Sequence, residues 1–240
     1  RIWVVSGLST CYDFGVKTDL ENRLIMQIYW HGYSSVLIEA THNQQDVSLV
    51  TDPFETEGSM KFPKTLTPDI LLLSHQDRKR FSQDAIQGKP FIISDPGEYE
   101  VKGLYVQGYQ DKSVDAEQLE RPVIYRLVVE NMMIAFLGQL QRKLTDQEIE
   151  DLGNVDVLLL PVGGGDVMSS KLASEMISLI EPRVVVPLYH DVPGLKAPLE
   201  HVDQFCKALG VCQRQDSNKL KISKKDLPAD DILVAVLERG

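Results

Sequence analysis

The sequence has few cysteines and no long hydrophobic run, and both absences narrow the class of protein. Only three cysteines, Cys11, Cys206 and Cys212, occur in 240 residues. Such an odd, sparse count forms no disulfide framework, so we expect reduced thiols and a cytoplasmic location. No apolar run reaches the roughly 18 residues that a membrane helix needs. The sequence therefore predicts no membrane span.

Positive charge is also scarce. Lys and Arg total 25 against 35 Asp and Glu, which gives a formal net charge of −10. This balance argues against nucleic acid or an anionic membrane surface as the main partner, although it leaves room for a local basic patch. With 43% hydrophobic and 25% charged residues, and no internal repeat, the composition is typical of a globular protein.

One buried strand and the loop after it form the first candidate site. The apolar run Ile70–Leu73 follows Thr67-Pro68 and precedes the polar segment 74–80. A short apolar run with such boundaries predicts a strand buried on both faces. Loops at the carboxyl ends of buried strands often carry the chemistry of α/β proteins. We therefore expect the site at residues 74–80.

This loop resembles a motif of the metallo-β-lactamase superfamily, in its small bacterial branch of lactonase-like, zinc-dependent hydrolases. There the strand ends in Ser/Thr-His-x-His-x-Asp-His, and the resemblance implies that two histidines grip one zinc while the Asp and the last His grip a second. In this chain the four motif positions are His75, Asp77, Lys79 and Arg80. Two cations cannot act as metal ligands. The metal-ligand motif is therefore degenerate.

Three further positions depart from the pattern of the family. His31-Gly32-Tyr33-Ser34 stands where the family has Tyr-Gly-His-Ser, and Tyr189-His190 stands where it has His-Tyr. Gln139 replaces an Asp that bridges the two metals. No histidine lies between His75 and His190, although the family usually has a ligand in the loop corresponding to 110–121. The Tyr–His exchange has two interpretations. Either the residues have drifted in a site that no longer has to bind metal, or His31 and His190 reach a rearranged polar cluster.

Other polar residues have a functional and a plain structural interpretation. Asp52 precedes Pro53 and matches a family Asp beside the metals, but Asp before Pro is also an ordinary turn residue. The segment 96–100, Pro-Gly-Glu-Tyr-Glu, closely matches this branch. Its Glu98 and Glu100 share one strand face, where a solvated surface is favoured over acid–base chemistry. The glycine loop 163–165 lacks the Lys-Ser/Thr of a phosphate-binding P-loop.

The order of elements predicts an α/β protein with the four-layer αββα sandwich of that superfamily. Met26 fits a natural start, so residues 1–25 are interpreted as a loosely packed or non-native N-terminal extension, and 26–240 as one domain. The predicted helices are 145–152, 169–180 and 199–209, with one or two helical turns at 83–87. The predicted strands are 27–30, 35–40, 47–52, 70–73, 91–94, 104–109, 122–130, 132–137, 155–160, 183–188, 219–223 and 232–237.

Three functions follow from these observations. The first is a non-catalytic pseudo-hydrolase that acts by binding a small anionic ligand or a protein partner. The second is a metal-dependent hydrolase of a lactone or phosphoester with a reduced or relocated site. The third is an anion-binding module that uses the basic loop, whose alternative is a solvated turn. The former site is His75, Asp77, Lys79, Arg80, Gln139 and Tyr189; the ligand-binding candidates are Asp52, Arg78, Lys79, Arg80, His31 and His190.

No cofactor is expected, with zinc as the alternative if a metal site persists. A catalytic zinc usually needs three protein ligands. Here His75 and Asp77 are the weak candidates, and His31 or His190 would have to complete the set. The two cations of the loop would also repel a divalent ion. The sequence therefore predicts that a two-metal site is lost.

Overall fold

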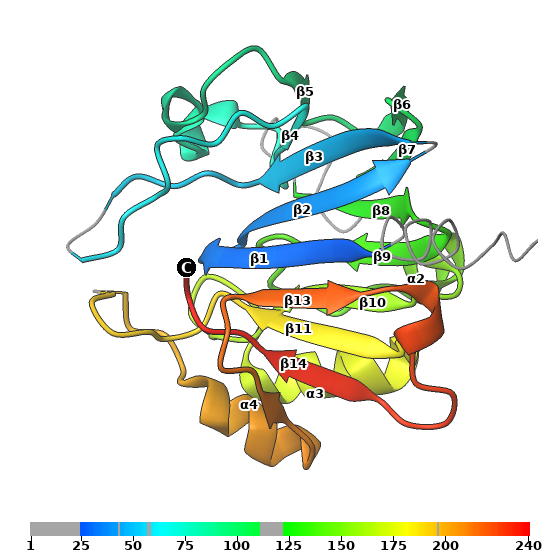
Figure 1. The fold of residues 1–240 in the computed structure, drawn as a ribbon. Helices are drawn as coiled ribbons and strands as arrows, with labels where there is room; N and C mark the ends of the chain where they lie inside the picture. Colours follow the sequence, from blue (N-terminus) through cyan, green and yellow to red (C-terminus); the bar gives the residue numbers. More distant parts are fainter. Residues whose placement is uncertain (1–24, 43, 57–58, 111–121, 196) are drawn as a thin grey trace, which may run out of the picture.

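The computed structural model describes residues 25–42, 44–56, 59–110, 122–195 and 197–240, and two mixed β-sheets pack face to face in this part of the chain (Figure 1). The expected extension at 1–25 lies almost wholly outside the described residues. The two-sheet arrangement with helices is the α/β sandwich that the sequence predicts.

The first sheet has six strands in the order β13-β1-β2-β3-β4-β5. Its first half is a meander of antiparallel strands, and β3, β4 and β5 then run parallel. The run that the sequence marks as a buried strand is β4, and all three of its residues are buried. The bounds are β1 (Met26–Gly32), β2 (Ser35–His42), β3 (Gln45–Thr51), β4 (Ile70–Leu72), β5 (Phe91–Ile93) and β13 (Lys219–Ile222).

The second sheet has eight strands in the order β12-β14-β11-β10-β9-β8-β7-β6. Strands β6 to β9 are antiparallel, whereas β9, β10, β11 and β14 run parallel. The two-residue edge strand β12 is the element that sequence patterning missed. The bounds are β6 (Gly97–Val101), β7 (Leu104–Gln110), β8 (Val123–Val129), β9 (Met132–Phe136), β10 (Val157–Pro161), β11 (Val184–Leu188), β12 (Gln213–Arg214) and β14 (Leu233–Val236).

The outer layers of the sandwich differ from each other. Helices α2 (Asp146–Leu152), α3 (Ser170–Ile180) and α4 (Val202–Leu209) belong to the second half of the chain, and buried residues of α3 and α4 share an apolar cluster with β10, β11 and β14. Beyond the first sheet, a smaller cluster lies under the irregular segment that holds the short 3₁₀ turns η1 (Arg78–Arg80) and η2 (Gln83–Ala85). The expected helical turns at 83–87 are thus a single 3₁₀ turn.

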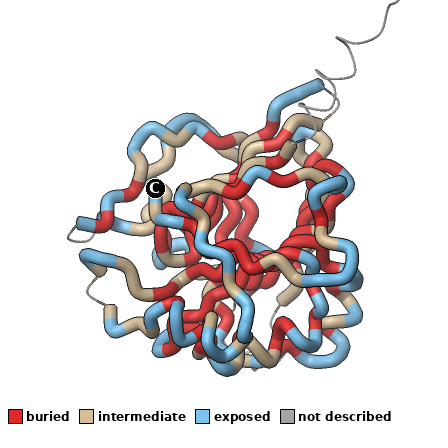
Figure 2. The backbone as a smooth tube through the Cα atoms, turned by 60° about the horizontal axis from the view of Figure 1, so that its bottom comes forward, coloured by how far each residue is buried: buried red, intermediate tan, exposed pale blue. Residues whose placement is uncertain are grey.

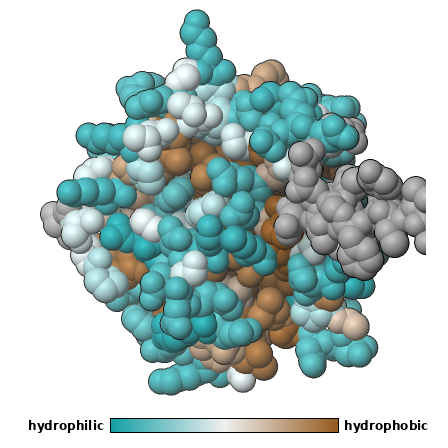
Figure 3. All heavy atoms as spheres, viewed as in Figure 1, coloured by the Kyte–Doolittle hydropathy of each residue, from teal (hydrophilic) through white to brown (hydrophobic). Residues whose placement is uncertain are grey.

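The main core fills the space between the sheets, where both contribute alternate side chains. It contains Trp30, Tyr125 and Phe136, all fully or almost fully buried. Figure 2 shows buried backbone along the strands, while the exposed positions gather in the connections. The face seen in Figure 3 is mostly hydrophilic, and apolar side chains are visible between the polar ones. Within the described residues, no helix has the length and apolar character to cross a membrane.

The strand directions gather several chain segments at one edge of the sandwich. Strands β1, β3, β11 and β14 all end on the left side of Figure 1, as their arrowheads show. Strand β4 is parallel to β3, and β10 is parallel to β11, so their carboxyl ends lie at the same edge. This edge carries the loops after β1, β3, β4, β9 and β11. The motif positions of the sequence analysis therefore come together there.

The expectation of reduced thiols is wrong for two of the three cysteines. Cys206 and Cys212 form a disulfide, with Cα atoms 5.5 Å apart. Gly210 takes a left-handed conformation, with φ of 83°, and ends α4, so the chain turns back and brings Cys212 beside the last helical turn. A left-handed glycine after a helix favours this reversal. The cytoplasmic location that rested on reduced thiols stays a prediction.

Candidate functional site

At the centre of the strand-end edge lies a buried pair of Asp52 and Ser74. Asp52 follows β3 with a left-handed backbone, φ 38°, and its carboxylate accepts hydrogen bonds from the Ser74 amide at 2.7 Å and the Ser74 hydroxyl at 2.6 Å. Burial raises the pKa of Asp52 to about 6, while these hydrogen bonds and the charge of Arg80 oppose the rise. The Asp52 carboxylate thus holds the chain at the end of β4 in position through Ser74.

The loop after β4 is held by its own polar groups. The carboxylate of Asp77 accepts from the amide of Lys79 at 3.0 Å and so caps η1, while the Asp77 amide donates to Nδ1 of His75 at 3.1 Å. Arg78 turns away to the next connection, where its Nε donates to Ser94 Oγ at 2.8 Å and its Nη2 lies 3.6 Å from Asp95. The two residues that the sequence favours as metal ligands therefore serve the loop itself.

Two of the altered motif positions contact each other directly. Nη2 of Arg80, at the last motif position, donates to Oε1 of Gln139 at 3.3 Å. Gln139 stands where the family has its bridging carboxylate, so a guanidinium–amide contact joins two places that hold metal ligands in the family. Gly138 allows this close approach, because a Cβ there would lie 2.1 Å from Cβ of Ser74. The charge of Arg80 also acts on Asp52 and Tyr189.

Tyr33 and Tyr189, the two tyrosines of the Tyr–His exchange, form one aromatic wall. Their ring centroids lie 5.0 Å apart, and Phe54 packs edge-on against Tyr33 at 5.2 Å. The amide of Tyr189 donates to the Tyr33 carbonyl at 2.9 Å, and both residues are left-handed, with φ of 54° and 47°. Non-glycine residues rarely adopt that conformation, which is concentrated at functional sites. Burial raises the pKa of Tyr189.

The exchanged histidines lie inside the protein. His31 and His190 are 6% and 4% exposed. Both ring nitrogens of His31, and Nε2 of His190, lack a hydrogen-bond partner among the described residues. His190 packs on Trp30 with ring centroids 4.5 Å apart, and His31 has its edge to Phe62. Burial lowers the pKa of each imidazole to about 4, so both are neutral near pH 7.

A cavity of about 650 Å³ opens beside the basic loop. Three cations and two carboxylates line it, which gives a positive balance in a protein of net charge −10. The side chain of Lys79 is exposed and makes no ion pair within the part of the chain that the structure describes. Low-dielectric walls concentrate the field of such a cluster on an entering anion. The lining includes Tyr33, Phe54, Glu55, Thr56, Arg78, Lys79, Arg80, Ser82 and Asp84.

The donor set of this edge does not fit a bound zinc ion. Among the described residues, no group of three or more His, Cys, Asp or Glu side chains is arranged to hold a metal. The carboxylates of Asp52 and Asp77 already accept hydrogen bonds, and the two imidazoles nearest in sequence to the tyrosines are buried. Arg80 adds a fixed positive charge beside Gln139. Zinc needs about four donors with few competing cations.

The structure thus brings Asp52, Arg80, Gln139 and Tyr189 together, places Arg78 on the same cavity as Arg80 but bonded to Ser94 and Asp95, and buries His31 and His190. Sequence reasoning missed Ser74 as the partner of Asp52 and Tyr33 as the contact of Tyr189. The sequence did contain a signal for the pair of Asp52 and Ser74. Asp52 follows β3 and Ser74 follows β4, and these two strands are parallel neighbours. The second pair had no such signal, because its ring contact and its backbone hydrogen bond join the loops after β1 and β11, which lie far apart in the sequence.

The chain is similar to known proteins over most of its length. The family model described as a β-lactamase superfamily domain matches residues 27–189. A metal-dependent hydrolase of the UPF0173 family from Salinibacter ruber is 26% identical over 206 residues, which cover 73% of this chain and 89% of that protein. A UPF0173 protein from Pyrococcus abyssi is 23% identical over 195 residues, covering 70% and 85%.

Solved structures give the same picture. A candidate zinc-dependent hydrolase of the metallo-β-lactamase superfamily from Thermotoga maritima matches with a TM-score of 0.71 and 27% identity, covering 88% of this chain and 98% of that one. An isothiocyanate hydrolase from Delia radicum gut bacteria has a TM-score of 0.59 at 10% identity, covering 82% and 99%. The second likeness concerns the fold alone.

Proposed function

The chain belongs to the metallo-β-lactamase superfamily, and on that premise we propose that it binds a small anion, such as a phosphate or carboxylate compound, without using a metal. The single observation that carries the proposal is the contact between Arg80 and Gln139 at two former ligand positions. A guanidinium in place of a metal still attracts anions, and it presents planar donors that match phosphate and carboxylate oxygens.

The surrounding residues support a binding role. Lys79 adds an exposed ammonium at the same cavity, and the hydroxyl of Ser82 lines it as well. Tyr33 and Phe54 line one side of the cavity, and Tyr189 packs against Tyr33 behind them. The cavity therefore combines aromatic side chains with charged and hydroxyl groups that can bind an anion. On this proposal the protein is a pseudo-hydrolase that has kept the pocket and changed its chemistry.

Metal-dependent hydrolysis is the second candidate, and the names of the relatives favour it. Proteins from Salinibacter ruber and Thermotoga maritima are named as metal-dependent or candidate zinc-dependent hydrolases, at 26% and 27% identity. Hydrolysis by this chain would require a metal held by a donor set other than the altered motif. The two candidates differ in one measurable quantity, the metal content of the purified protein.

Titration with inorganic phosphate and with citrate, followed by calorimetry, tests the first proposal. We expect saturable binding that weakens as salt is raised, because exposed charges are screened. Lys79→Ala and Arg80→Ala should each weaken binding by about tenfold, the size of one charged hydrogen bond. Lys89→Ala is the matched control, since Lys89 is exposed and lies outside the cavity lining.

Elemental analysis of protein purified without a chelator decides between the two candidates. Zinc, manganese or iron near one ion per chain, together with a lower melting temperature in EDTA, would support the hydrolase. A ligand that binds only the native state stabilises it, so a chelator should have no effect on a metal-independent protein. If the wild type, Lys79→Ala and Arg80→Ala proteins bind phosphate and citrate equally well, the proposed anion site is wrong.

A further inference from the structure

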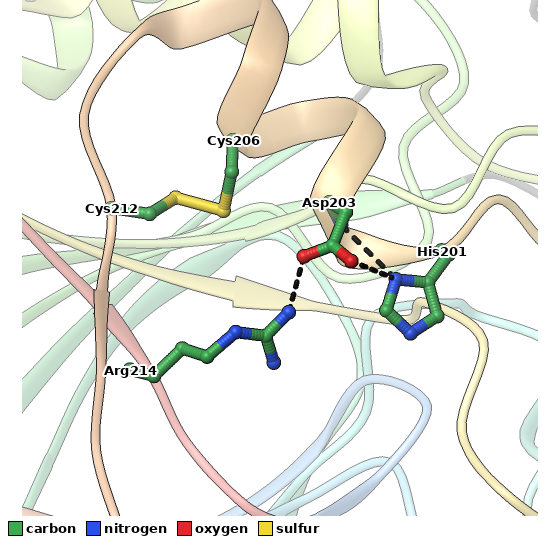
Figure 4. Close-up of a disulfide and its surroundings, with 5 residues drawn as sticks. All are labelled: His201, Asp203, Cys206, Cys212 and Arg214. Atoms are coloured by element: carbon green, nitrogen blue, oxygen red, sulfur yellow. Dashed lines mark hydrogen bonds and ion pairs between the residues drawn. A yellow bond between two sulfur atoms is a disulfide. The ribbon is translucent and has the colours of Figure 1, made fainter.

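A disulfide lies at the end of α4, outside the candidate anion site. The disulfide Cys206–Cys212 joins the last turn of α4 to the segment that leads into β12 (Figure 4). Both cysteines are only partly buried, and Gly210, Val211 and Gln213 around them are exposed. A small thiol can therefore reach the sulfur atoms. Both cysteines also pack against the apolar cluster beneath α3 and α4, so the pair lies between that cluster and the exposed residues around it.

The two chain segments that the disulfide joins, α4 and the segment around β12, both contribute to the lining of a cavity of about 420 Å³, although the cysteines themselves do not line it. The start of α4 supplies one wall through His201 and Val202, and the segment from Arg214 to Asp216 supplies another. The floor includes Trp30 and His190, which pack on each other. Any change in the position of β12 relative to α4 therefore changes the shape of this cavity.

Backbone pairing with β14 holds β12 in the sheet, and the Gln215 amide also donates to the Val236 carbonyl at 2.8 Å, but few interactions other than the disulfide tie β12 to α4. The strand has two residues, lies at the edge of the sheet, and pairs only with β14, at Gln213–Ala235 and Arg214–Val236. Arg214 forms an ion pair with Asp203 of α4, but both side chains are more than half exposed. Figure 4 shows Asp203 between Arg214 and His201. Exposed ion pairs contribute little, so the covalent link is the main restraint between β12 and α4.

We propose that Cys206–Cys212 is a reversible thiol–disulfide modification site, cleaved by dithiols, and that its state sets the mobility of β12 and the access to this cavity. The reagent thiolate attacks one cysteine sulfur, the S–S bond breaks, and the electron pair leaves on the other sulfur, which takes up a proton. The second thiol of the reagent then attacks the mixed disulfide, forms a cyclic disulfide and releases the second cysteine as a thiol. The protein gains two electrons and two protons, and the dithiol is oxidised.

Thiol titration of the native full chain with and without dithiothreitol tests the chemical part. We expect reduction to add two titratable thiols per chain under conditions that keep the circular dichroism spectrum unchanged. The Cys11→Ser variant isolates the pair, so its count should rise from none to two. If two thiols appear only in denaturant, the disulfide is inaccessible in the native protein and the proposal is overturned.

Hydrogen exchange tests the structural part. After reduction, amides in 211–216 should exchange at least about tenfold faster, since a closed loop of this size restrains the chain by at least that factor. Amides of β13 serve as the internal control and should be unchanged. The Cys206→Ser/Cys212→Ser variant should match the reduced protein and ignore dithiothreitol. Equal exchange in both states would show that the sheet, not the disulfide, holds β12.

Acrylamide quenching of Trp30 reports on the cavity itself. The chain has two tryptophans, so Trp3→Phe leaves Trp30 as the only emitter. Trp30 is 1% exposed, and we expect its quenching constant to rise at least about twofold on reduction as the wall of the cavity loosens. An unchanged constant in a protein whose thiols are reduced would overturn the link between the disulfide and the cavity.

Discussion

The phenols at the strand-end edge and the imidazoles in the interior are neighbours in sequence, yet they lie in two different chemical environments. Tyr33 and Tyr189 contact each other beside Arg80, whereas His31 and His190 are buried against Phe62 and Trp30. The edge thus presents phenols and cations, whereas the interior holds two imidazoles that are neutral near pH 7. Within each of the two short motifs, the phenol lies at the edge and the titratable imidazole is buried.

The largest expected effect comes from returning metal ligands to the edge. The variant Asp77→His, Lys79→Asp, Arg80→His, Gln139→Asp and Tyr189→His should bind at least one zinc ion. His75 and the two new imidazoles at 77 and 189 supply three nitrogens, enough for a catalytic type of site. We expect micromolar affinity, or about 8 kcal/mol of binding free energy. Little turnover is expected, because the groups that orient the ligands have also changed.

Calorimetry with zinc and competition with a chromophoric chelator measure this gain. The control carries Lys79→Ala and Arg80→Ala and keeps Asp77, Gln139 and Tyr189, so both cations are removed while His75 is the only one of the three nitrogens present. A folded five-fold variant without zinc affinity would mean that the edge has changed in backbone shape as well as in side chains. The edge would then differ from a metal site in the path of its loops and not only in its side chains.

Acid should destabilise the interior next most strongly. The folded pKa of His31 and of His190 is about 4, below the ordinary value of 6.5. A lowered folded pKa means that the stabilisation is present above pH 6.5 and is lost as the pH falls toward 4. For each imidazole the free energy of unfolding then falls by about 3 kcal/mol, since one pKa unit corresponds to about 1.4 kcal/mol. Urea unfolding at pH 7, 6 and 5 measures the slope.

His31→Phe and His190→Phe remove the two rings one at a time. Each single variant should recover about half of the acid-induced loss, and the double variant nearly all of it, provided that each still folds at pH 7. A double variant with the wild-type slope would place the acid sensitivity elsewhere. That result would weaken the view that the interior now carries the protonation chemistry.

The edge should respond to pH in the opposite direction through Asp52. Its folded pKa is about 6, above the ordinary value of 3.8. A raised folded pKa means that the contribution is present below pH 3.8 and is lost as the pH rises through 6. The contribution of Asp52 to the free energy of unfolding that is lost on this rise in pH is about 3 kcal/mol. Asp52→Asn should remove this dependence and make the acid-induced destabilisation steeper, whereas Asp46→Asn, at an exposed site on β3, should leave the slope unchanged.

The smallest effect on stability is expected for Arg80 and Lys79. Both side chains are exposed. The idea that they replace a metal as a buried ion pair would require a loss of about 3–5 kcal/mol on truncation. For exposed groups we expect less than about 1 kcal/mol for Arg80→Ala and for Lys79→Ala. Denaturant melts compare these losses with the anion affinities of the same variants. A loss above about 3 kcal/mol would indicate a structural ion pair.

The fold was accessible from the sequence because each motif coincided with a pattern of burial. The run Ile70–Leu73 predicted β4, and the capping box that starts at Thr145 predicted α2, whose Thr145 side chain accepts from the Glu148 amide. The loss of ligand residue types was also readable, since Lys79, Arg80 and Gln139 cannot be mistaken for zinc ligands.

The rest depends on contacts that no local pattern encodes. Whether His31 faces the pocket or the core is set by the left-handed turn at Gly32-Tyr33, and periodicity has no information on such a turn. The disulfide needed the reversal at Gly210. The pairing of Arg80 with Gln139 joins the loops after β4 and β9, which belong to different sheets. Only the packed sandwich brings those loops together.

The left-handed backbone at Tyr33 and Tyr189 has an evolutionary consequence. Every tyrosine codon becomes a histidine codon by a single base change, and the two main-chain conformations that would present the ring at the edge are already in place. Reversion at these positions therefore asks for no insertion and no rebuilt loop. A histidine at either position would still meet the positive charges of Lys79 and Arg80, which repel a divalent ion. Changes at 79 and 80 would therefore have to accompany the new imidazoles before a metal could bind.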